Sequence, residues 1–218
     1  ETKPAETKPA ETKPAETKPA ETKPAAKPAA KPAAKPAAKP AAKPAAKPAA
    51  KPAELPAFEK SISDKIVEKF GDKIEVEFVK ENRVGIKVNR DDIHDVAEFI
   101  RDGLNYDHVE SVSGVDYPQD KEIEVVYHIG SYSDSSLAKQ LLVLATRAQR
   151  EENPIPGKDA TKLPTLRDIF YSVEFHEREV FEMFGVYFTG HPDNRRLLLP
   201  EDWADLPPLR KDFAIKGR

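Results

Sequence analysis

Proline repeats at the start of the chain restrict any compact fold to the residues after position 53. Residues 1–25 are five copies of Glu-Thr-Lys-Pro-Ala, and residues 26–53 are seven copies of Ala-Lys-Pro-Ala. A proline in every repeat prevents a continuous helix, because proline lacks a backbone donor and disfavours helical geometry in the residue before it. The repeats contain no apolar side chain larger than Ala, so burial cannot offset the entropy of ordering them. The sequence therefore predicts a disordered, polyproline-like tail over residues 1–53.

The charges of the chain are divided between this tail and the remainder. The tail carries 12 Lys and 5 Glu, a net charge of +7, whereas the other 165 residues carry 23 basic and 33 acidic side chains and are −10. An acidic body is not typical of a nucleic-acid-binding domain. The lysines of the tail leave one alternative open, in which residues 1–53 bind a polyanion such as nucleic acid by neutralising its phosphates.

Cysteine is absent from the sequence. This excludes disulfides, catalytic thiols and iron–sulfur clusters held by thiolates of this chain. There is no run of 18 apolar residues, which a membrane-spanning helix requires, and no hydrophobic signal-peptide core at the start. We therefore expect any association with a membrane to be made through partner proteins.

Hydrophobic periodicity predicts helices and strands in blocks between residues 54 and 185. Some segments repeat apolar residues at helical spacing, and others alternate them with charged residues as half-buried strands do. The predicted helices are 58–70, a segment from Asp91 or Asp92 to 104, and a helical region over 165–184 that stops at Gly185. The predicted strands are 74–78, 84–88, 107–116, 121–131 and 138–147, followed by a polar loop over 150–163. Short links between these blocks favour an α+β domain, with an antiparallel or mixed sheet and helices on one face.

Residues 186–218 are predicted to form an extended C-terminal interaction arm. Four prolines interrupt any long element in it, at positions 192, 200, 207 and 208. It nevertheless carries large apolar residues, which a disordered tail would lack: Leu197, Leu198, Leu199, Trp203, Leu206, Leu209 and Phe213. Apolar content without regular structure indicates that another surface satisfies the backbone and side chains of the arm. We expect that surface to be a partner protein.

A series of short motifs runs through this part of the sequence. They are Glu177-Arg178-Glu179, Phe184-Gly185-Val186, Gly190-His191-Pro192-Asp193, Arg195-Arg196, Leu197 to Leu199, Pro200, Asp202-Trp203 and Pro208-Leu209-Arg210-Lys211-Asp212-Phe213. Together they resemble the signature of the 30-kDa, or C-type, subunit family of respiratory complex I and its relatives, including the archaeal F420H2 dehydrogenases. A weaker resemblance continues upstream through 114–118 and 125–128 and extends the similarity over roughly residues 58 to 213.

The chain departs from that family pattern at a few positions. Phe175 stands where Trp is usual, Glu182 where Asp is usual, and Asp205 where Gly is expected. The spacing from Trp203 to Leu209 is also one residue longer than expected. The last two differences concern the path of the arm after Trp203.

The resemblance implies a cofactor-free structural subunit in the peripheral arm of a complex I-like quinone or phenazine oxidoreductase. Such a subunit packs against the large hydrogenase-like (49-kDa, D-type) subunit near the quinone site and beside iron–sulfur subunits, at the cytoplasmic face of the cell membrane. It supports electron transfer coupled to ion translocation, while the iron–sulfur clusters and the quinone belong to its partners. The electron donor stays open between NADH, F420H2 and ferredoxin, and the related membrane-bound hydrogenases stay an alternative.

The same resemblance implies that the chain has no catalytic, cofactor-binding or metal-binding residues of its own. The residues expected at the partner interface are Glu177, Arg178, Glu179, His191, Asp193, Arg195, Arg196, Trp203, Arg210, Lys211 and Asp212. Their charges nearly balance along the arm, which suits ion pairs in which an Arg grips a carboxylate across an interface.

Three local patterns suggest other chemistry. The pair His176-Glu177 suggests a zinc protease, but Val180 stands where that motif needs a second His. Four carboxylates at helical spacing could perform acid–base work, although a solvated face or ion pairs is the more common role: Glu174, Glu177, Glu179 and Glu182. The Gly190–Asp193 segment could be half of a catalytic triad in a stand-alone hydrolase, but no nucleophile motif accompanies it, so a turn is preferred.

Overall fold

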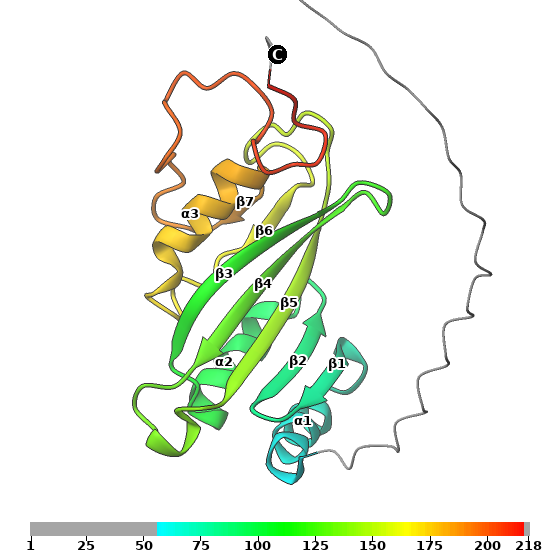
Figure 1. Cartoon of the computed structure of the whole chain (residues 1–218), viewed down its shortest axis with the longest axis vertical. Coiled ribbons are helices and arrows are strands. Elements are labelled where there is room, and N and C mark those ends of the chain that lie inside the picture. Colours follow the sequence, from blue (N-terminus) through cyan, green and yellow to red (C-terminus); the bar gives the residue numbers. More distant parts are fainter. Residues whose placement is uncertain (1–55, 216–218) are drawn as a thin grey trace, which may run out of the picture. The chain divides into compact units, whose positions relative to one another are not determined.

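The computed structural model describes residues 56–215, and the predicted disordered tail over 1–53 lies outside the described residues. The elements follow one another as a mixture of helices and strands (Figure 1). The α-helices are α1 (Ala57–Phe70), α2 (Ile93–Leu104) and α3 (Val173–Phe184), and η1 (Gly71–Lys73) and η2 (Ser135–Leu137) are short 3-10 helices. The strands are β1 (Ile74–Lys80), β2 (Arg83–Val88), β3 (His108–Tyr117), β4 (Glu122–Gly130), β5 (Leu141–Gln149), β6 (Lys162–Pro164) and β7 (Tyr187–Thr189).

Five strands form one mixed sheet in the order β1-β2-β5-β4-β3. The pairs β1–β2, β3–β4 and β4–β5 are antiparallel, and β2–β5 is parallel. The two hairpins arise where adjacent strands are joined by links too short for a crossover, whereas α2 and the β3–β4 hairpin separate β2 from its parallel neighbour. The predicted α+β fold with a mixed sheet is confirmed.

One face of the sheet is apolar and packs on the helices. Every second residue of β4 is fully buried, from Ile123 to Ile129, and belongs to one core with the buried faces of α1, α2 and α3. The other face is charged: Arg147 on β5 donates to Glu124 on β4 at 2.8 Å and to Glu122 at 2.6 Å. This alternation, which follows from the two-residue period of a strand, places the helices on one face as predicted.

Two predicted boundaries differ from the structure by three residues or more, and β6 begins at Lys162 inside the predicted polar loop over 150–163. The last strand of the sheet begins at Leu141 instead of 138, because η2 and a turn occupy the preceding residues. The helical region over 165–184 is helical only from Val173. The Leu166 backbone N–H is bonded to the Glu177 carboxylate at 2.9 Å, so residues 165–172 form turns that lead into α3.

Two short parallel strands flank α3 in the sequence, and the second of them, β7, leads from α3 to the arm. β6 and β7 pair with each other, and the Thr165 N–H donates to the Thr189 carbonyl at 3.0 Å. Between α3 and β7 the chain turns at Gly185, whose φ of 79° lies in the left-handed region that favours glycine. A Cβ at Gly185 would come within 2.8 Å of the Pro154 Cγ and 3.1 Å of the Arg210 Nη2. Regular structure therefore continues to residue 189, and the irregular arm begins at Gly190.

Residues 56–215 contain no helix with the length and apolar character that would let it cross a lipid bilayer.

Candidate partner interface

The arm runs around the C-terminal half of α3 and returns to the sheet (Figure 1). Hydrogen bonds hold it at several points along its length, from Asp193 to Lys211. The structure therefore corrects the expectation that another protein supplies all of its backbone partners. Much of that role belongs to α3, to the loop after β5 and to the end of β3 in the same chain.

Glu182 near the end of α3 binds the leucine run of the arm. Its Oε2 accepts from the Leu197, Leu198 and Leu199 N–H groups at 3.0 Å each, and its Oε1 accepts from the Leu198 N–H at 2.9 Å. The side chain is 4% exposed, so the carboxylate replaces its water shell with backbone donors. One acidic residue of α3 thus fixes three consecutive peptide groups, so this stretch of the arm is ordered although it forms no helix or strand of its own.

Two arginines bind the carbonyl groups of the arm. Arg178 on α3 donates through Nε to the Arg195 carbonyl at 2.9 Å and through Nη2 to the Arg196 carbonyl at 3.0 Å. Arg196 itself donates to the Pro200 and Trp203 carbonyls at 2.9 and 2.8 Å. The planar guanidinium suits this work, because it directs several donors at once toward neighbouring acceptors. Both arginines were predicted at a partner interface, and the structure gives them an internal role in the arm.

Arg210 binds the last part of the arm to the C-terminal end of α3. It is 2% exposed and donates through Nε to the Phe184 carbonyl at 2.6 Å and through Nη1 to the Glu151 carbonyl. Its Nη2 has no hydrogen-bond partner among residues 56–215. Burial lowers the pKa of Arg210, with the neighbouring charge of Arg150 acting in the same direction. The guanidinium closes the C-terminal end of α3, where the last carbonyls of a helix need donors.

Asp116 at the end of β3 joins the sheet to the closing motif of the arm. Its side chain accepts from Arg150 Nε at 2.6 Å and from the Lys211 N–H at 2.9 Å. Burial by itself would raise the pKa of Asp116, but these hydrogen bonds and the nearby positive charges together lower it. Arg150 also pairs with Asp212 at 2.7 Å. Asp116, from the weaker upstream resemblance, and Lys211 and Asp212, from the closing motif, are thereby brought together within one chain.

A buried polar cluster lies at the root of the arm. The Glu177 carboxylate is fully buried and accepts from the Tyr127 hydroxyl at 3.2 Å, from the Leu166 N–H at 2.9 Å and from the Thr165 hydroxyl. Burial raises the pKa of Glu177 to about 7. The His191 Nε2 lies 3.9 Å from the Glu177 Oε2. This cluster joins α3, β4 and the first turn of the arm through one carboxyl group.

The turn at the start of the arm uses His191 as a structural residue. Its Nε2 faces the Glu174 carbonyl at 3.1 Å, and its Nδ1 accepts from the Asp193 N–H at 3.0 Å. These partners fix the tautomer with the proton on Nε2. Gly190 precedes it with a φ of 86°, which a turn of this kind requires. The interpretation of Gly190–Asp193 as a turn is confirmed.

The four carboxylates of α3 do not form the solvated face that was the preferred expectation. Glu174 pairs with Arg167 at 3.1 Å and Glu179 is exposed, as that expectation requires. For Glu177 and Glu182 the expectation is wrong, because both are buried and accept hydrogen bonds from backbone and hydroxyl groups. The helical period placed them on the buried side of α3, where such donors surround them.

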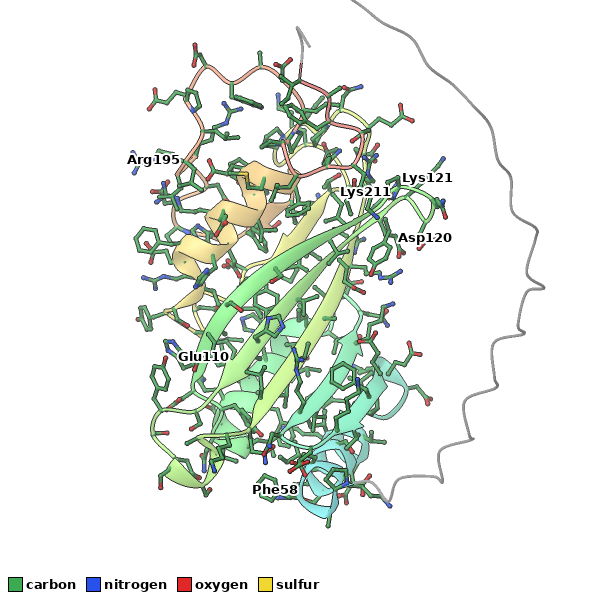
Figure 2. The ribbon with its side chains drawn as sticks, viewed as in Figure 1. Phe58, Glu110, Asp120, Lys121, Arg195 and Lys211 are labelled. Atoms are coloured by element: carbon green, nitrogen blue, oxygen red, sulfur yellow. The ribbon has the colours of Figure 1, made fainter. Side chains whose placement is uncertain are left out.

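The outward surface of the arm carries exposed leucines, with charged groups of both signs around them. Leu198 and Leu209 are 63% and 56% exposed, although their backbones are bonded to α3. Arg195 projects outward on one side, while Lys211 lies on the other side near the β3–β4 hairpin (Figure 2). Arg195 grips Asp193 at 2.8 Å, and this pairing holds the pKa of Asp193 well below its ordinary value. The predicted interface residues therefore divide into those whose side chains hold the arm within the chain and those that are exposed.

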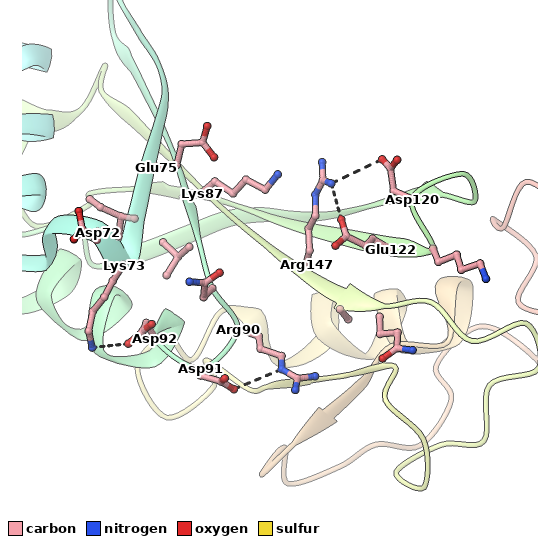
Figure 3. Close-up of a pocket in the computed structure, with 16 residues that line it drawn as sticks. Asp72, Lys73, Glu75, Lys87, Arg90, Asp91, Asp92, Asp120, Glu122 and Arg147 are labelled. Carbon is pink, nitrogen blue, oxygen red and sulfur yellow. Dashed lines mark hydrogen bonds and ion pairs between the residues drawn. The ribbon is translucent and has the colours of Figure 1, made fainter.

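A separate, charged pocket lies at one end of the open face of the sheet (Figure 3). It has a volume of about 970 Å³. Lys73 pairs there with Asp92 at 2.6 Å, and Arg147 pairs with Glu122 at 2.6 Å and with Asp120 at 4.0 Å. These ion pairs connect neighbouring elements of the fold. Within residues 56–215, no group of three or more His, Cys, Asp or Glu side chains is placed to hold a metal ion.

Several residues that organise the arm were not predicted at the site. Glu182 was noted for its departure from the family pattern, and Asp116 belongs to the weaker upstream resemblance, but neither was assigned a contact. Arg150 and Glu151 were placed only in or near a polar loop. Their partners lie between 15 and 95 positions away in sequence. A local sequence pattern does not predict contacts between residues so far apart.

Comparison with known proteins identifies the family. The family model of the respiratory-chain NADH dehydrogenase 30 Kd subunit matches residues 86–218. The chain belongs to this family. The C-type subunit of the F(420)H(2) dehydrogenase of Methanosarcina mazei is 36% identical over 131 residues, which cover 60% of this chain and 75% of that protein. The C-type fold of this family is therefore the fold described above, and the chain is a subunit of a complex I-like respiratory complex.

Two further similar proteins extend the comparison. One chain in the structure of the membrane-bound sulfane sulfur reductase, described as an archaeal respiratory membrane complex, is 30% identical with a TM-score of 0.57, covering 72% of this chain and 86% of its own length. The C/D-type subunit of the NADH-quinone oxidoreductase of Phocaeicola vulgatus is 34% identical over 128 residues. That match covers 59% of this chain but 22% of the relative, whose name describes a C part and a D part in one protein.

Proposed function

We propose that this chain is a structural subunit in the peripheral arm of a complex I-like quinone or phenazine oxidoreductase and packs on the large D-type subunit near the quinone site. The observation that carries the proposal is the exposed apolar side of the arm. Leu198 and Leu209 stand in solvent on a backbone that Glu182 and the α3 carbonyls hold in place. An exposed apolar surface that is already ordered is typical of a protein–protein contact, since binding need not order it.

The fused relative supports the choice of partner. A C part and a D part joined in one protein, as the name of the Phocaeicola vulgatus relative describes, must lie close enough for one chain to contain both. In this proposal the iron–sulfur clusters and the quinone belong to partner subunits, and the C-type subunit stabilises the assembly through which electron transfer is coupled to ion translocation. It would be peripheral, at the cytoplasmic face of the membrane.

The similarity to a chain of the sulfane sulfur reductase favours a second candidate with the same role. There the C-type subunit would support a complex with a different electron acceptor. Purification of the native complex through a tag on this chain, followed by assay with quinone, phenazine and sulfane sulfur acceptors, distinguishes the two. The donor, whether NADH, F420H2 or ferredoxin, is identified in the same preparation.

Replacing both exposed leucines should break the contact with the D-type subunit. We expect Leu198→Glu with Leu209→Glu to weaken binding at least about tenfold, because charges would be desolvated at the apolar centre of an interface. Thermal unfolding of the free subunit should change little, since both side chains are already in water. Binding is measured by interferometry with the purified D-type subunit.

Phe58→Glu is the matched control for that experiment. Phe58 is also an exposed large apolar residue, 46% accessible, and lies on α1 away from the arm (Figure 2). Its substitution should leave the affinity unchanged. If the leucine variant binds as tightly as the wild type, the arm is not the contact surface. If the wild type itself does not bind the D-type subunit, the proposed partner is wrong.

The two adjacent arginines of the arm should respond differently to truncation. Arg195→Ala removes an exposed side chain whose hydrogen bonds within residues 56–215 go to Asp193, and should affect assembly without altering the amide exchange of the arm. Arg196→Ala removes the donor for the Pro200 and Trp203 carbonyls and should speed exchange over residues 200–203 as well as weaken assembly. Hydrogen-exchange mass spectrometry and a pull-down separate these effects. Equal exchange in both variants would contradict the internal role of Arg196.

A further inference from the structure

A groove lies between the arm, the C-terminal turn of α3 and the loop after β5. It has a volume of about 500 Å³. Its apolar lining residues are all partly exposed: Pro154, Phe181, Trp203, Leu206, Pro207 and Phe213. They come from three segments that are far apart in sequence and are tied together by Arg196 and Arg210. The groove is therefore built by the same contacts that order the arm.

Three of the polar side chains in the groove, those of Glu182, Arg196 and Trp203, already have partners within the chain. The Glu182 carboxylate holds the leucine run, and Arg196 donates to carbonyl groups of the arm. The indole N–H of Trp203 donates to the Leu206 carbonyl at 3.2 Å. A molecule in the groove would therefore contact mainly apolar surface and would form few hydrogen bonds with its walls.

Two aromatic side chains of the groove, Trp203 and Phe213, pack near each other and remain partly exposed. The Trp203 and Phe213 rings lie 6.1 Å apart between centroids at an angle of 33°. Large aromatic side chains gain most when they are fully buried, and they commonly anchor protein–protein interfaces. Here the rings are held in place but partly exposed, so a molecule that filled the groove would complete their burial without first ordering them.

We propose that the groove receives an apolar segment of the large D-type subunit, with a basic residue beside it. Asp205 lines the groove, and the neighbouring Glu201 and Asp202 are exposed in the arm, so a flanking positive charge matches the field of these carboxylates. This inference rests on the proposed function, because it takes the D-type subunit as the partner. It adds a second, concave contact to the outward leucines and gives Trp203 the role of an anchor for the partner.

The single Trp of the chain makes a direct test possible. With 5-fluorotryptophan incorporated, the protein has one ¹⁹F resonance, and it reports on Trp203 in the groove wall. Addition of unlabelled D-type subunit should shift this resonance and reduce its dependence on the H2O/D2O ratio of the solvent. A resonance unchanged at saturating D-type subunit would overturn the proposal.

Substitutions in the groove provide the second measurement. Pro156→Arg and Ala204→Arg place a long charged chain at two exposed positions that line the groove, and each should weaken D-type binding about tenfold or more. Ile155→Arg is the control, because Ile155 is an exposed neighbour that does not line the groove. Its affinity should stay within about twofold of the wild type. The thermal unfolding temperature of all three should match the wild type.

The outcomes separate this inference from the proposed function. If the leucine double variant loses binding while both groove variants keep it, the D-type subunit docks on the arm but leaves the groove empty, and the inference is wrong. If the ¹⁹F resonance instead shifts with the concentration of this protein alone, a second copy of the chain fills the groove, which also overturns it. Absence of any wild-type binding would refute the proposed function itself.

Discussion

Glu182→Ala should release the arm from α3 while the sheet stays folded. The substitution removes the acceptor for three consecutive amides, at Leu197, Leu198 and Leu199. Hydrogen bonds to a charged group contribute about 1.5–3 kcal/mol each, but these amides can partly regain water, so we expect a total loss of about 3 kcal/mol. For a domain of this size that corresponds to a decrease of roughly 6–12 °C in the unfolding temperature. Differential scanning calorimetry measures it.

Amide exchange identifies where the loss occurs. In the wild type residues 197–199 should be protected, and in Glu182→Ala they should exchange nearly as fast as an unfolded peptide, while β3, β4 and β5 stay protected. Glu179→Ala is the control on the same helix, since Glu179 is exposed and its side chain makes no hydrogen bond or ion pair among the described residues. Protection of residues 197–199 that survives in the Glu182 variant would show that something other than this carboxylate orders the arm.

The same carboxylate shows why the sequence predicted the fold better than the site. β4 alternates buried apolar residues with polar ones, and that period is a local property that depends only on which face meets the core. The helices α1 and α2 follow from similar local spacing, and Gly185 stops α3 as expected. For these elements, the hydrophobic pattern and the terminating residue are sufficient.

The arm has no period, so its structure depends on contacts between distant residues. Its prolines correctly indicated that residues 190–215 would form no helix or strand, but they did not indicate which surface would bind the backbone. The answer required knowing that Glu182 and Arg178 point toward the returning chain, which is a property of the packed domain. A partner protein was the natural expectation from sequence, and α3 supplies much of what that partner was expected to provide.

Because α3 holds the arm, several charged residues of the family signature have a role within this chain. Arg178, Arg196 and Arg210 hold the arm in place through hydrogen bonds to backbone carbonyl groups, so their loss would affect a partner contact through the shape of the arm. The groups that stay accessible to a partner include the exposed leucines, Arg195, Lys211 and the partly exposed rings of the groove. A residue of the signature can thus be needed for assembly without itself touching the partner.

Stability between pH 5 and 8 should fall as the pH rises, with Glu177 as a main cause. Burial raises the pKa of its carboxyl from an ordinary value of 4.5 to about 7. Below pH 4.5 both the native and unfolded states hold the proton. Between 4.5 and about 7 the native state keeps a proton that the unfolded state releases, so the free energy of unfolding decreases. The difference amounts to about 3 kcal/mol, and the decrease is complete above pH 7.

Other titrating groups act in different directions or at different pH. The hydrogen-bonded Asp116 has a lowered pKa, so its contribution to stability is lost only when the pH falls below the ordinary range of Asp. Burial lowers the pKa of His128, which opposes the Glu177 trend near and below pH 6.5. A comparison of variants is therefore needed to isolate Glu177.

Glu177→Gln isolates it, because a neutral amide resembles the protonated acid. The Gln carbonyl can accept from the Leu166 N–H and the Tyr127 hydroxyl, and its amide can donate to the Thr165 hydroxyl. We expect the variant to match the wild type near pH 5 and to exceed it by about 3 kcal/mol at pH 8, in urea unfolding at each pH. Glu179→Gln, an exposed change on the same helix, should follow the wild-type curve. Parallel curves for wild type and Glu177→Gln would mean that Glu177 is ionised in the native state throughout this range, and that its hydrogen bonds outweigh the effect of burial.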